Sequence, residues 1–489
     1  MKILVIDIGT SSMRGILFDE KGKKLAVKQK KYEPVKYSDG RIEQPPFDWT
    51  DGAENICRDI ALEAERQKVT VDRIAVTAQR SAILPVDEDG RPLMDTIMWQ
   101  DRRNAAICRE LEVHNPLIFE KSGAAVNTVF SGSRMTWIAR NCPELRGKIH
   151  KYVNIPEYVM HDMTGEYRTD VTYGSRSHLM NLRERKWDRE LLDLFEIREE
   201  QLCMLGEPGT VVGTLTREFA ARTGLQEGTP VVSAGGDQQC AAIGQGAYRQ
   251  ETLSIVAGTG GFLVSALDQV PEKLHRGLIC NCSSVPGRYM LEANVLTCCS
   301  ALDWFCKTFY DWNREEISYD KINSDLGELD GRVSSALVLP CFQGRSTPEW
   351  NPEARSVFGN ISLNTRRNDL LKALLEGIFL EIQNNIELFS GYVPVHQAYI
   401  SGGMTNSPVI NQLQADVYGM TLYHMEDSES TALGALMTAL VGAGIYRDFD
   451  QAFTEIRGTE KTVCYLPNAA LHREYEKKRA VMNQKYKAW

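Results

Sequence analysis

The chain has 489 residues, of which 43% are hydrophobic and 25% are charged. This balance is ordinary for a folded globular protein and excludes a disordered chain, a collagen-like chain and a coiled-coil rod. The net charge of −9, with no long basic run, argues against general nucleic-acid binding. We find neither a signal peptide at the start nor about 18 uninterrupted apolar residues. We therefore expect a cytoplasmic protein that binds neither nucleic acid nor membranes.

The first predicted elements form a β-meander. Ile3–Ile6 is a buried-type strand that ends at Asp7, and Met13–Phe18 and Leu25–Val27 are two further strands. The small polar turn Gly9-Thr10-Ser11-Ser12 joins the first strand to the second. A P-loop or a dinucleotide-binding fold would continue from such a turn into a helix, so the sequence disfavours both.

The same pattern returns later in the chain. A strand over Leu253–Ala257, the turn Gly258-Thr259-Gly260-Gly261 and a strand over Phe262–Ser265 follow one another. We interpret this as a remote internal duplication with two α/β domains, each offering one hairpin whose backbone N–H groups suit a phosphate. Two unrelated tight hairpins explain the turns alone equally well. We place the boundary between Ile243 and Gln250, which gives domains over residues 1–245 and 246–489.

Apolar periodicity predicts three long helices. They span Phe47–Arg66, Asp369–Phe389 and Ser430–Val441. Twelve cysteines without a Cys-x-x-Cys pair indicate free thiols rather than a metal or redox site.

Two aspartates stand where strands end. Asp7 ends a buried strand beside a turn, where a carboxylate suits a divalent metal or its waters facing phosphate oxygens; alternatively it only caps the turn. Asp237 follows the strand Pro230–Val232 and two glycines, at the strand edge where α/β sheets place ligands. Its carboxylate suits a base that takes a proton from a hydroxyl attacking phosphorus. It also suits the N-cap of the next helix, and both roles are compatible.

Two polar segments are candidate contacts for a polyhydroxylated ligand. Thr77-Ala78-Gln79-Arg80-Ser81 follows a strand over Ile74–Val76, and Trp99-Gln100-Asp101-Arg102-Arg103 follows later. Together they supply an amide, guanidinium groups, an acid and an indole. Alternatively, Asp101 and its arginines form a structural ion-pair network and Trp99 belongs to the core.

A glycine pair follows another strand. Gly402-Gly403 comes after Tyr399–Ser401 and before a helix over Pro408–Tyr418. Such a turn lets a nucleobase or ribose lie against bare backbone, although it is also an ordinary strand-to-helix loop.

In this order the motifs resemble the FGGY family of carbohydrate kinases, within the actin/Hsp70/sugar-kinase superfamily, over nearly the whole chain. The matching stretches are Asp7–Arg14, Gly236–Gln238, Gly258–Gly260, Gly402–Gly403 and the signature helix from Asp369 to Gly377. The resemblance implies two actin-like (ribonuclease H-like) α/β domains, with ATP and substrate in the cleft between them. Homodimers are common in the family, so a homodimer is the assembly that the resemblance suggests.

The resemblance also implies roles for individual residues. The reaction would be Mg²⁺-dependent transfer of the γ-phosphoryl group of ATP to a sugar or polyol hydroxyl, with Asp237 as base and Asp7 serving the metal and the phosphates. The implied substrate contacts are Gln79, Arg80, Ser81, Trp99, Asp101, Asp237, Gln238 and Phe262. The implied ATP contacts are Gly9, Thr10, Ser11, Arg14, Gly258, Thr259, Gly260, Gly402, Gly403 and Asn406.

The acceptor segments look most like the glycerol kinase branch, with two departures. Ser81 stands where that branch has Glu, and Val129 where it has Tyr. The smaller side chains leave room for a longer substrate, and each lost hydrogen-bond partner costs on the order of 1–3 kcal/mol. We therefore predict a ketopentose such as xylulose, or a related sugar or polyol, in carbohydrate catabolism. Glycerol is the alternative substrate, and an actin- or Hsp70-like ATPase without a sugar substrate is the alternative of another class.

Overall fold

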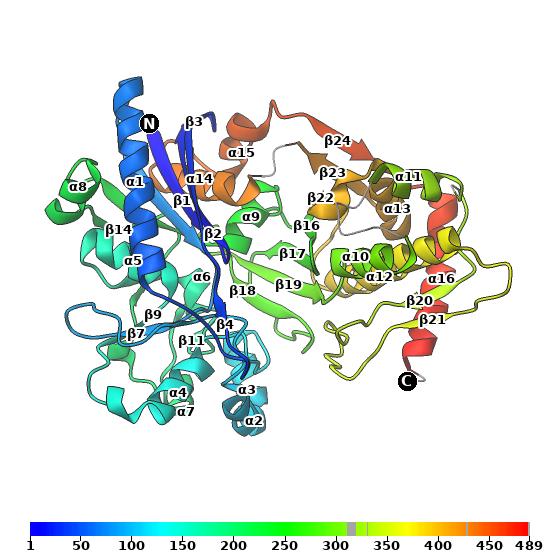
Figure 1. Cartoon of the computed structure of the whole chain (residues 1–489), viewed down its shortest axis with the longest axis horizontal. Coiled ribbons are helices and arrows are strands. Elements are labelled where there is room, and N and C mark those ends of the chain that lie inside the picture. Colours follow the sequence, from blue (N-terminus) through cyan, green and yellow to red (C-terminus); the bar gives the residue numbers. More distant parts are fainter. Residues whose placement is uncertain (311–318, 330, 427–428, 488–489) are drawn as a thin grey trace.

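Two β-sheets with helices packed on their faces form the two halves of the computed structural model (Figure 1). The structure describes residues 1–310, 319–329, 331–426 and 429–487. The chain enters the first sheet at its N-terminus and ends in a long helix on the far side of the second (Figure 1).

The first sheet has six strands in the order β14-β15-β6-β1-β2-β3. Their bounds are β1 Lys2–Ile8, β2 Ser12–Asp19, β3 Lys24–Lys31, β6 Arg73–Ala78, β14 Val211–Thr214 and β15 Pro230–Gly236. In β1, Leu4 and Ile6 pack into the core on one face, whereas Ile3 and Val5 pack into the core on the other. Because both faces are covered, the strand reads as a continuous apolar run rather than an alternating one.

The second sheet has seven strands in the order β18-β19-β17-β16-β22-β23-β24. Their bounds are β16 Thr252–Ala257, β17 Gly261–Leu267, β18 Ile279–Cys282, β19 Tyr289–Val295, β22 Gln397–Ser401, β23 Thr421–Met425 and β24 Thr462–Tyr465.

The two sheets repeat one topology. The series β3-β2-β1-β6-β15-β14 matches β19-β17-β16-β22-β23-β24 strand by strand, with the same parallel and antiparallel neighbours. Two chance hairpins would not share six strand positions. The predicted pair of α/β domains, each with its own strand–turn–strand unit, is therefore confirmed.

Helices cover both sheets, and the three predicted long ones are confirmed as α1, α12 and α14. The helix bounds in the first half are α1 Phe47–Gln67, α2 Ala105–Leu111, α3 Asn115–Ser122, α4 Gly132–Asn141, α5 Ile155–Thr164, α6 Val171–Gly174, α7 Arg189–Phe195, α8 Arg217–Thr223 and α9 Asp237–Gly244. Those in the second half are α10 Cys299–Phe309, α11 Tyr319–Gly327, α12 Arg367–Ser390, α13 Pro408–Tyr418, α14 Ser430–Gly442, α15 Phe449–Arg457 and α16 Ala469–Lys487.

Helices α9 and α14 cross where the two halves meet. A Cβ on Gly434 would lie 1.8 Å from the carbonyl oxygen of Cys240, and a Cβ on Gly244 would lie 1.9 Å from that of Ser430. Side chains of α14 such as Leu436 share a core with Ile3 of the first sheet. A helix of the second half thus packs directly on the sheet of the first.

Two further findings bear on the expectations from composition. Within the described residues, no helix is both long and apolar enough to cross a membrane. All twelve cysteines are free, as predicted.

Candidate active site

The candidate residues of the first half gather where three neighbouring parallel strands end. In the sheet register, Asp7 of β1 pairs with Thr77 of β6, and Thr77 pairs with Gly235 of β15. The carboxyl ends of parallel strands meet at one edge of a sheet, which is where ligands bind in such folds. Asp237 directly follows β15 and Arg80 lies two residues after β6, so the edge collects both aspartates and the first acceptor segment.

The carboxyl groups of Asp7 and Asp237 interact. Burial raises the pKa of Asp7 to about 7, the charge of Asp237 raises it as well, and Arg14 opposes the shift. Burial also raises the pKa of Asp237, with Arg80 opposing. A carboxyl pair whose charges repel suits a bound cation or a proton transfer.

The first turn is hydrogen-bonded to the candidate acceptor residues. Gln79 Nε2 donates to the Gly9 carbonyl at 3.2 Å, and Thr10 Oγ1 donates to Gln79 Oε1 at 3.2 Å. Trp99 Nε1 donates to Thr10 Oγ1, also at 3.2 Å. The structure therefore brings a candidate phosphate turn and two candidate substrate residues into one network.

Arg80 is the centre of a second network. Its Nε lies 3.7 Å from Asp237 Oδ1, its Nη1 donates to Glu292 Oε1 at 2.7 Å, and its Nη2 donates to Gln238 Oε1. A Cβ on Gly236 would lie 2.6 Å from Arg80 Cδ. The lack of a side chain at Gly236 therefore allows Arg80 to approach this backbone closely.

Glu292 and Arg176 belong to the same cluster and were missed by the sequence analysis. Arg176 Nη1 lies 3.2 Å from Glu292 Oε2, and its guanidinium stacks over Phe130 at 4.4 Å. Burial would raise the pKa of Glu292, but Arg80 and Arg176 outweigh it and hold that pKa below its usual value. The available signal was a carboxylate inside the mostly apolar strand β19.

Polar groups beneath the site fix the strand ends. The Tyr173 hydroxyl donates to the Gly235 carbonyl at 3.0 Å and accepts from the backbone N–H of Ala78 at 3.0 Å. The backbone N–H of Gly236 donates to Thr172 Oγ1 at 2.9 Å. These bonds tie the segment before Arg80 to the segment before Asp237, which limits the relative movement of the two side chains.

A small cavity of about 50 Å³ adjoins this cluster and is lined from both halves. Arg176 Nε and Asn294 Oδ1 are buried there without a hydrogen-bond partner in the part of the chain that the structure describes. Buried polar atoms of this kind are normally satisfied by water or a ligand. The lining residues are Arg176, Gln238, Phe262, Leu263, Val264, Ile279, Glu292, Ala293, Asn294 and Thr347.

Two predicted substrate residues are buried and hydrogen-bonded within the protein. Asp101 is fully buried, and its carboxylate accepts from the backbone N–H groups of Ile42 and Arg103 and from the Arg103 guanidinium. Four accepted bonds occupy the lone pairs of a carboxylate, so Asp101 anchors its loop, as the alternative interpretation had it. Ser81 is also buried, with its hydroxyl 3.5 Å from the carbonyl oxygen of Arg176.

The second turn is held by the start of α10. The Gly258 carbonyl accepts from Cys299 N and the Thr259 carbonyl accepts from Cys298 N, both at 2.8 Å. A Cβ on Gly260 would lie 2.7 Å from a carbonyl oxygen of β19. Thr259 itself is exposed, so the turn presents its tip to solvent.

The glycine pair of the second half lies against the end of β16. Gly402 has a φ of 100°, and a Cβ there would lie 2.3 Å from the Ala257 carbonyl oxygen. The Gly403 carbonyl accepts from the Tyr319 hydroxyl at 2.7 Å. Gly402, Gly403 and Asn406 are all exposed, which leaves their backbone open to a ligand.

Arg14 is paired across the two halves. Its Nη1 and Nη2 donate to the two carboxylate oxygens of Glu429, just before α14, at 2.7 and 2.5 Å. Ser11, in the first turn, is exposed.

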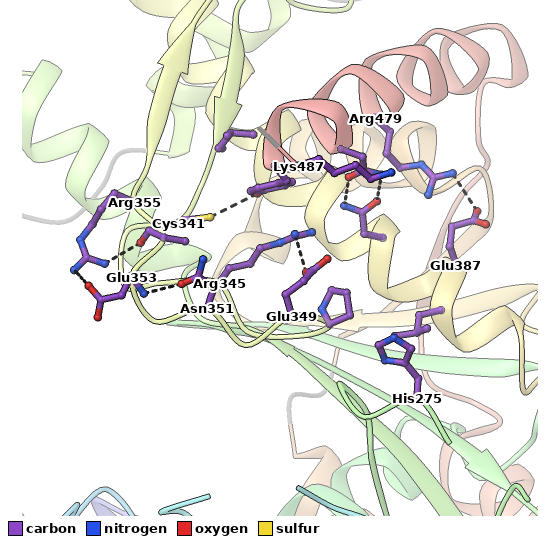
Figure 2. A pocket seen from close by; sticks show the side chains of 17 residues that line it. His275, Cys341, Arg345, Glu349, Asn351, Glu353, Arg355, Glu387, Arg479 and Lys487 are labelled. Atoms are coloured by element: carbon purple, nitrogen blue, oxygen red, sulfur yellow. Dashed lines mark hydrogen bonds and ion pairs between the residues drawn. The ribbon is translucent and has the colours of Figure 1, made fainter. Parts of the chain in front are cut away.

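A larger cavity of about 790 Å³ lies elsewhere, between α12, α16 and the loop after β20 (Leu337–Leu339). Figure 2 shows its charged side chains paired with one another, including Arg345 with Glu349 and Arg479 with Glu387. It contains none of the candidate site residues, so size does not locate the active site in this protein.

Family models match both halves of the chain. The N-terminal domain model of the FGGY family of carbohydrate kinases matches residues 2–244, and its C-terminal domain model matches residues 253–443. The chain belongs to the FGGY family of carbohydrate kinases. It is therefore a phosphotransferase with an alcohol group as acceptor, which excludes the ATPase alternative.

Relatives of this FGGY kinase carry more than one substrate name. A glycerol kinase from Thermococcus kodakarensis is 29% identical over 456 residues, covering 91% of this chain and 89% of the relative. The crystal structure of a xylulose kinase from Rhodospirillum rubrum matches with a TM-score of 0.93 at 23% identity, covering 100% of this chain and 99% of that one. The structure of Plasmodium falciparum glycerol kinase with ADP matches with a TM-score of 0.89 at 23% identity, covering 99% and 98%. These matches confirm the predicted actin-like fold class.

Proposed function

We propose that this FGGY kinase transfers the γ-phosphoryl group of ATP to a hydroxyl of a small sugar or polyol longer than glycerol, with a ketopentose such as xylulose as the preferred acceptor. The supporting observation is that Asp7 and Asp237 lie at one sheet edge, where Thr10 is hydrogen-bonded to Gln79 and Trp99 and where Arg80 Nε lies 3.7 Å from Asp237 Oδ1. In keeping with the family-model ranges, we divide the chain into an acceptor domain over residues 1–245 and a nucleotide domain over residues 246–489.

Asp237 is the proposed base. Burial raises the pKa of its carboxyl, which makes the ionised form a better proton acceptor from an acceptor hydroxyl. Arg80, whose Nε lies 3.7 Å from Asp237 Oδ1, opposes that shift of the pKa and so favours the ionised carboxylate. The proton of the attacking hydroxyl passes to Asp237 Oδ as the new oxygen–phosphorus bond forms and the bond to ADP breaks.

The donor set fits Mg²⁺. This ion is usually held by one or two carboxylates with the remaining positions taken by phosphate oxygens and water. Asp7, whose pKa is raised by burial and by the nearby charge of Asp237, is the carboxylate that would hold it. When bound, the ion neutralises charge on the phosphates.

The two turns and the glycine pair are the proposed nucleotide contacts. Exposed backbone at Ser11, Thr259 and Gly403 offers N–H groups to phosphate oxygens and a flat surface to the adenosine. Arg14 would add a guanidinium for phosphate once it leaves Glu429.

The structure at Ser81 and the small cavity supports an acceptor longer than glycerol. Ser81 is buried and its hydroxyl points to a backbone carbonyl, so it offers no carboxylate to a triol. The cavity of about 50 Å³, with unpartnered Arg176 Nε and Asn294 Oδ1, provides space and hydrogen-bonding groups for a further hydroxyl. Glycerol remains the second candidate because the 29% identical relative is a glycerol kinase.

A panel of acceptors tests the proposal. ADP formation is measured with ATP, Mg²⁺ and each of glycerol, xylulose, ribulose, erythritol, xylitol and gluconate, and the phosphorylated carbon is assigned by nuclear magnetic resonance. We expect the highest kcat/KM for a five-carbon acceptor and at least about 10-fold less for glycerol, since each unpaired buried group costs 1–3 kcal/mol. A kcat/KM for glycerol that exceeds all the others would contradict the substrate assignment, and ADP formation indifferent to every acceptor would contradict the kinase itself.

A further inference from the structure

We propose that Arg134 is a positioning residue that builds the acceptor site, by binding the backbone carbonyls of three separate loops that carry the acceptor contacts. The inference rests on the proposed function, because it concerns the loops assigned there to the acceptor. Arg134 lies in the first turn of α4, and none of its surface is exposed.

Each hydrogen bond that the guanidinium of Arg134 donates within the described residues goes to a backbone carbonyl oxygen. Nη1 donates to Ser81 O at 3.0 Å and Val129 O at 2.8 Å. Nη2 donates to Trp99 O at 2.5 Å and Thr128 O at 2.6 Å, with Asp101 O at 3.4 Å. One side chain thus joins the loop after β6, the loop around Trp99 and the segment before α4.

The proposed acceptor residues lie on these three loops, so the position of each loop's backbone sets the position of its side chains. The first carries Gln79 and Arg80, the second carries Trp99, and the third carries Val129. Nη1 binds the carbonyls of Ser81 and Val129 together, and these are the two positions at which the sequence departs from the glycerol kinase pattern. The spacing between those positions is therefore set by one planar group.

The backbone at Ser81 needs such a partner. Its φ of 72° lies in the left-handed region, which a non-glycine residue rarely adopts. A bond from a fixed guanidinium to its carbonyl oxygen orients that peptide. Tight turns of this kind persist where the surroundings determine them, and they cluster at binding sites.

A lysine could not replace this arrangement. Burial lowers the pKa of Arg134 to about 10 and the charge of Asp101 opposes that shift, so the group stays charged at neutral pH. A planar fork can serve carbonyls on two sides at once, whereas an ammonium is a single point with three donors. Arg134→Lys therefore keeps the positive charge and removes the planar arrangement of hydrogen-bond donors.

The experiment compares Arg134→Lys and Arg134→Met with Arg140→Met. Arg140 lies on the same helix, but at the surface, paired with Glu110 and Glu196. KM for the best acceptor, KM for ATP, kcat and Tm are measured for each variant. We expect Arg134→Lys to raise the acceptor KM at least about 10-fold, the equivalent of 1.4 kcal/mol, and to change the ATP KM less than about 2-fold. Arg140→Met should match the wild type in both.

Hydrogen exchange gives a readout that does not depend on turnover. Amides in residues 78–82, 99–103 and 127–131 should exchange faster in Arg134→Lys, while those around Gly402 should not change. An unchanged acceptor KM in Arg134→Lys would overturn the proposal, and so would acceptor and ATP KM values that rise in parallel with a fall in Tm. If the wild type phosphorylates no acceptor, the proposed function fails, and hydrogen exchange alone then decides whether Arg134 joins the three loops.

Discussion

The two halves of this kinase have sheets of the same topology but differ in the residues at the strand ends. In the first half, the ends of β1, β6 and β15 carry Asp7, Arg80 and Asp237. In the second half, the matching ends of β16 and β22 carry the glycine turns that begin at Gly258 and Gly402. One edge is built from titratable side chains and the other from exposed backbone.

This difference indicates how a duplicated fold divides a reaction. Carboxylates and guanidinium groups suit an acceptor that must lose a proton, whereas bare backbone suits a triphosphate and a flat base. We infer that the first sheet edge activates the acceptor and adds one phosphate turn, and that the second supplies the rest of the nucleotide site. Glu292 connects the two halves, since it lies in a strand of the second sheet and pairs with Arg80 and Arg176 of the first half.

The largest effect on kcat should follow from removing the carboxylate charge of Asp237 at the first edge. We expect Asp237→Asn to lower kcat about 1,000-fold, within the range for general-base catalysis, with ATP affinity retained because the second edge is intact. Steady-state rates and calorimetric ATP titration measure the two quantities. Asp193→Asn, at an exposed position on α7, is the control, and a near-normal kcat in Asp237→Asn would show that Asp237 is not the base.

The complementary variant is Gly402→Ala, at the sheet edge of the second half. The added Cβ would lie 2.3 Å from the Ala257 carbonyl oxygen at a φ of 100°, so the turn has to shift. We expect ATP to bind about 10-fold more weakly, the equivalent of 1.4 kcal/mol, with little change in the acceptor KM. Gly327→Ala, which meets open space, is the control. Equal losses of affinity for ATP and for the acceptor would contradict the proposed division of function between the two edges.

The pH dependence of stability tests the raised pKa of Asp7. Its pKa is about 7 in the folded protein against an ordinary 3.8, so the folded state holds the proton more tightly. The stability that this proton contributes is complete below pH 4 and is lost as pH rises through 7. Asp7→Asn should therefore have a higher Tm than the wild type at pH 8 and nearly the same Tm at pH 4, in calorimetry with EDTA and no nucleotide. A lower Tm for the variant at pH 8 would contradict the buried, repelled carboxylate.

The smallest expected effect concerns the link between the first turn and the acceptor segment. Trp99→Phe removes the indole N–H that donates to Thr10 at 3.2 Å. A net hydrogen bond is worth about 0.5–1.5 kcal/mol, so the acceptor KM should rise roughly 2- to 10-fold. Trp187→Phe loses a similar bond, to the Cys203 carbonyl at 3.0 Å, away from the strand ends, and should leave this KM unchanged.

Much of the fold could be predicted because its signals are local. Strands covered on both faces read as apolar runs such as Ile3–Ile6, and the glycine turns mark where they end. The two aspartates could be brought together because parallel strands end at one edge. The assignment of roles to individual site residues stays a prediction.

The rest could not be read from the sequence because it depends on distant partners. Asp101 lies in a segment with two arginines, and only the structure shows that Arg103 and Ile42 take all its lone pairs. Arg176 and Glu292 are 116 positions apart and meet across the two halves. The positive φ of Ser81 has no signature in a serine, since it is imposed by the groups around it.

The crossing of α9 and α14 restricts how the halves can rock. Helix α9 begins at Asp237, and the backbones of the two helices meet at Gly244 and Gly434 without side chains between them. Sliding of one helix along the other is therefore sterically blocked. Asp7, Arg80 and Asp237 all belong to the first half, on whose sheet α14 also packs. Movement between the halves would leave the spacing of these three side chains unchanged and alter their distances to Glu292 and to the turns at Gly258 and Gly402.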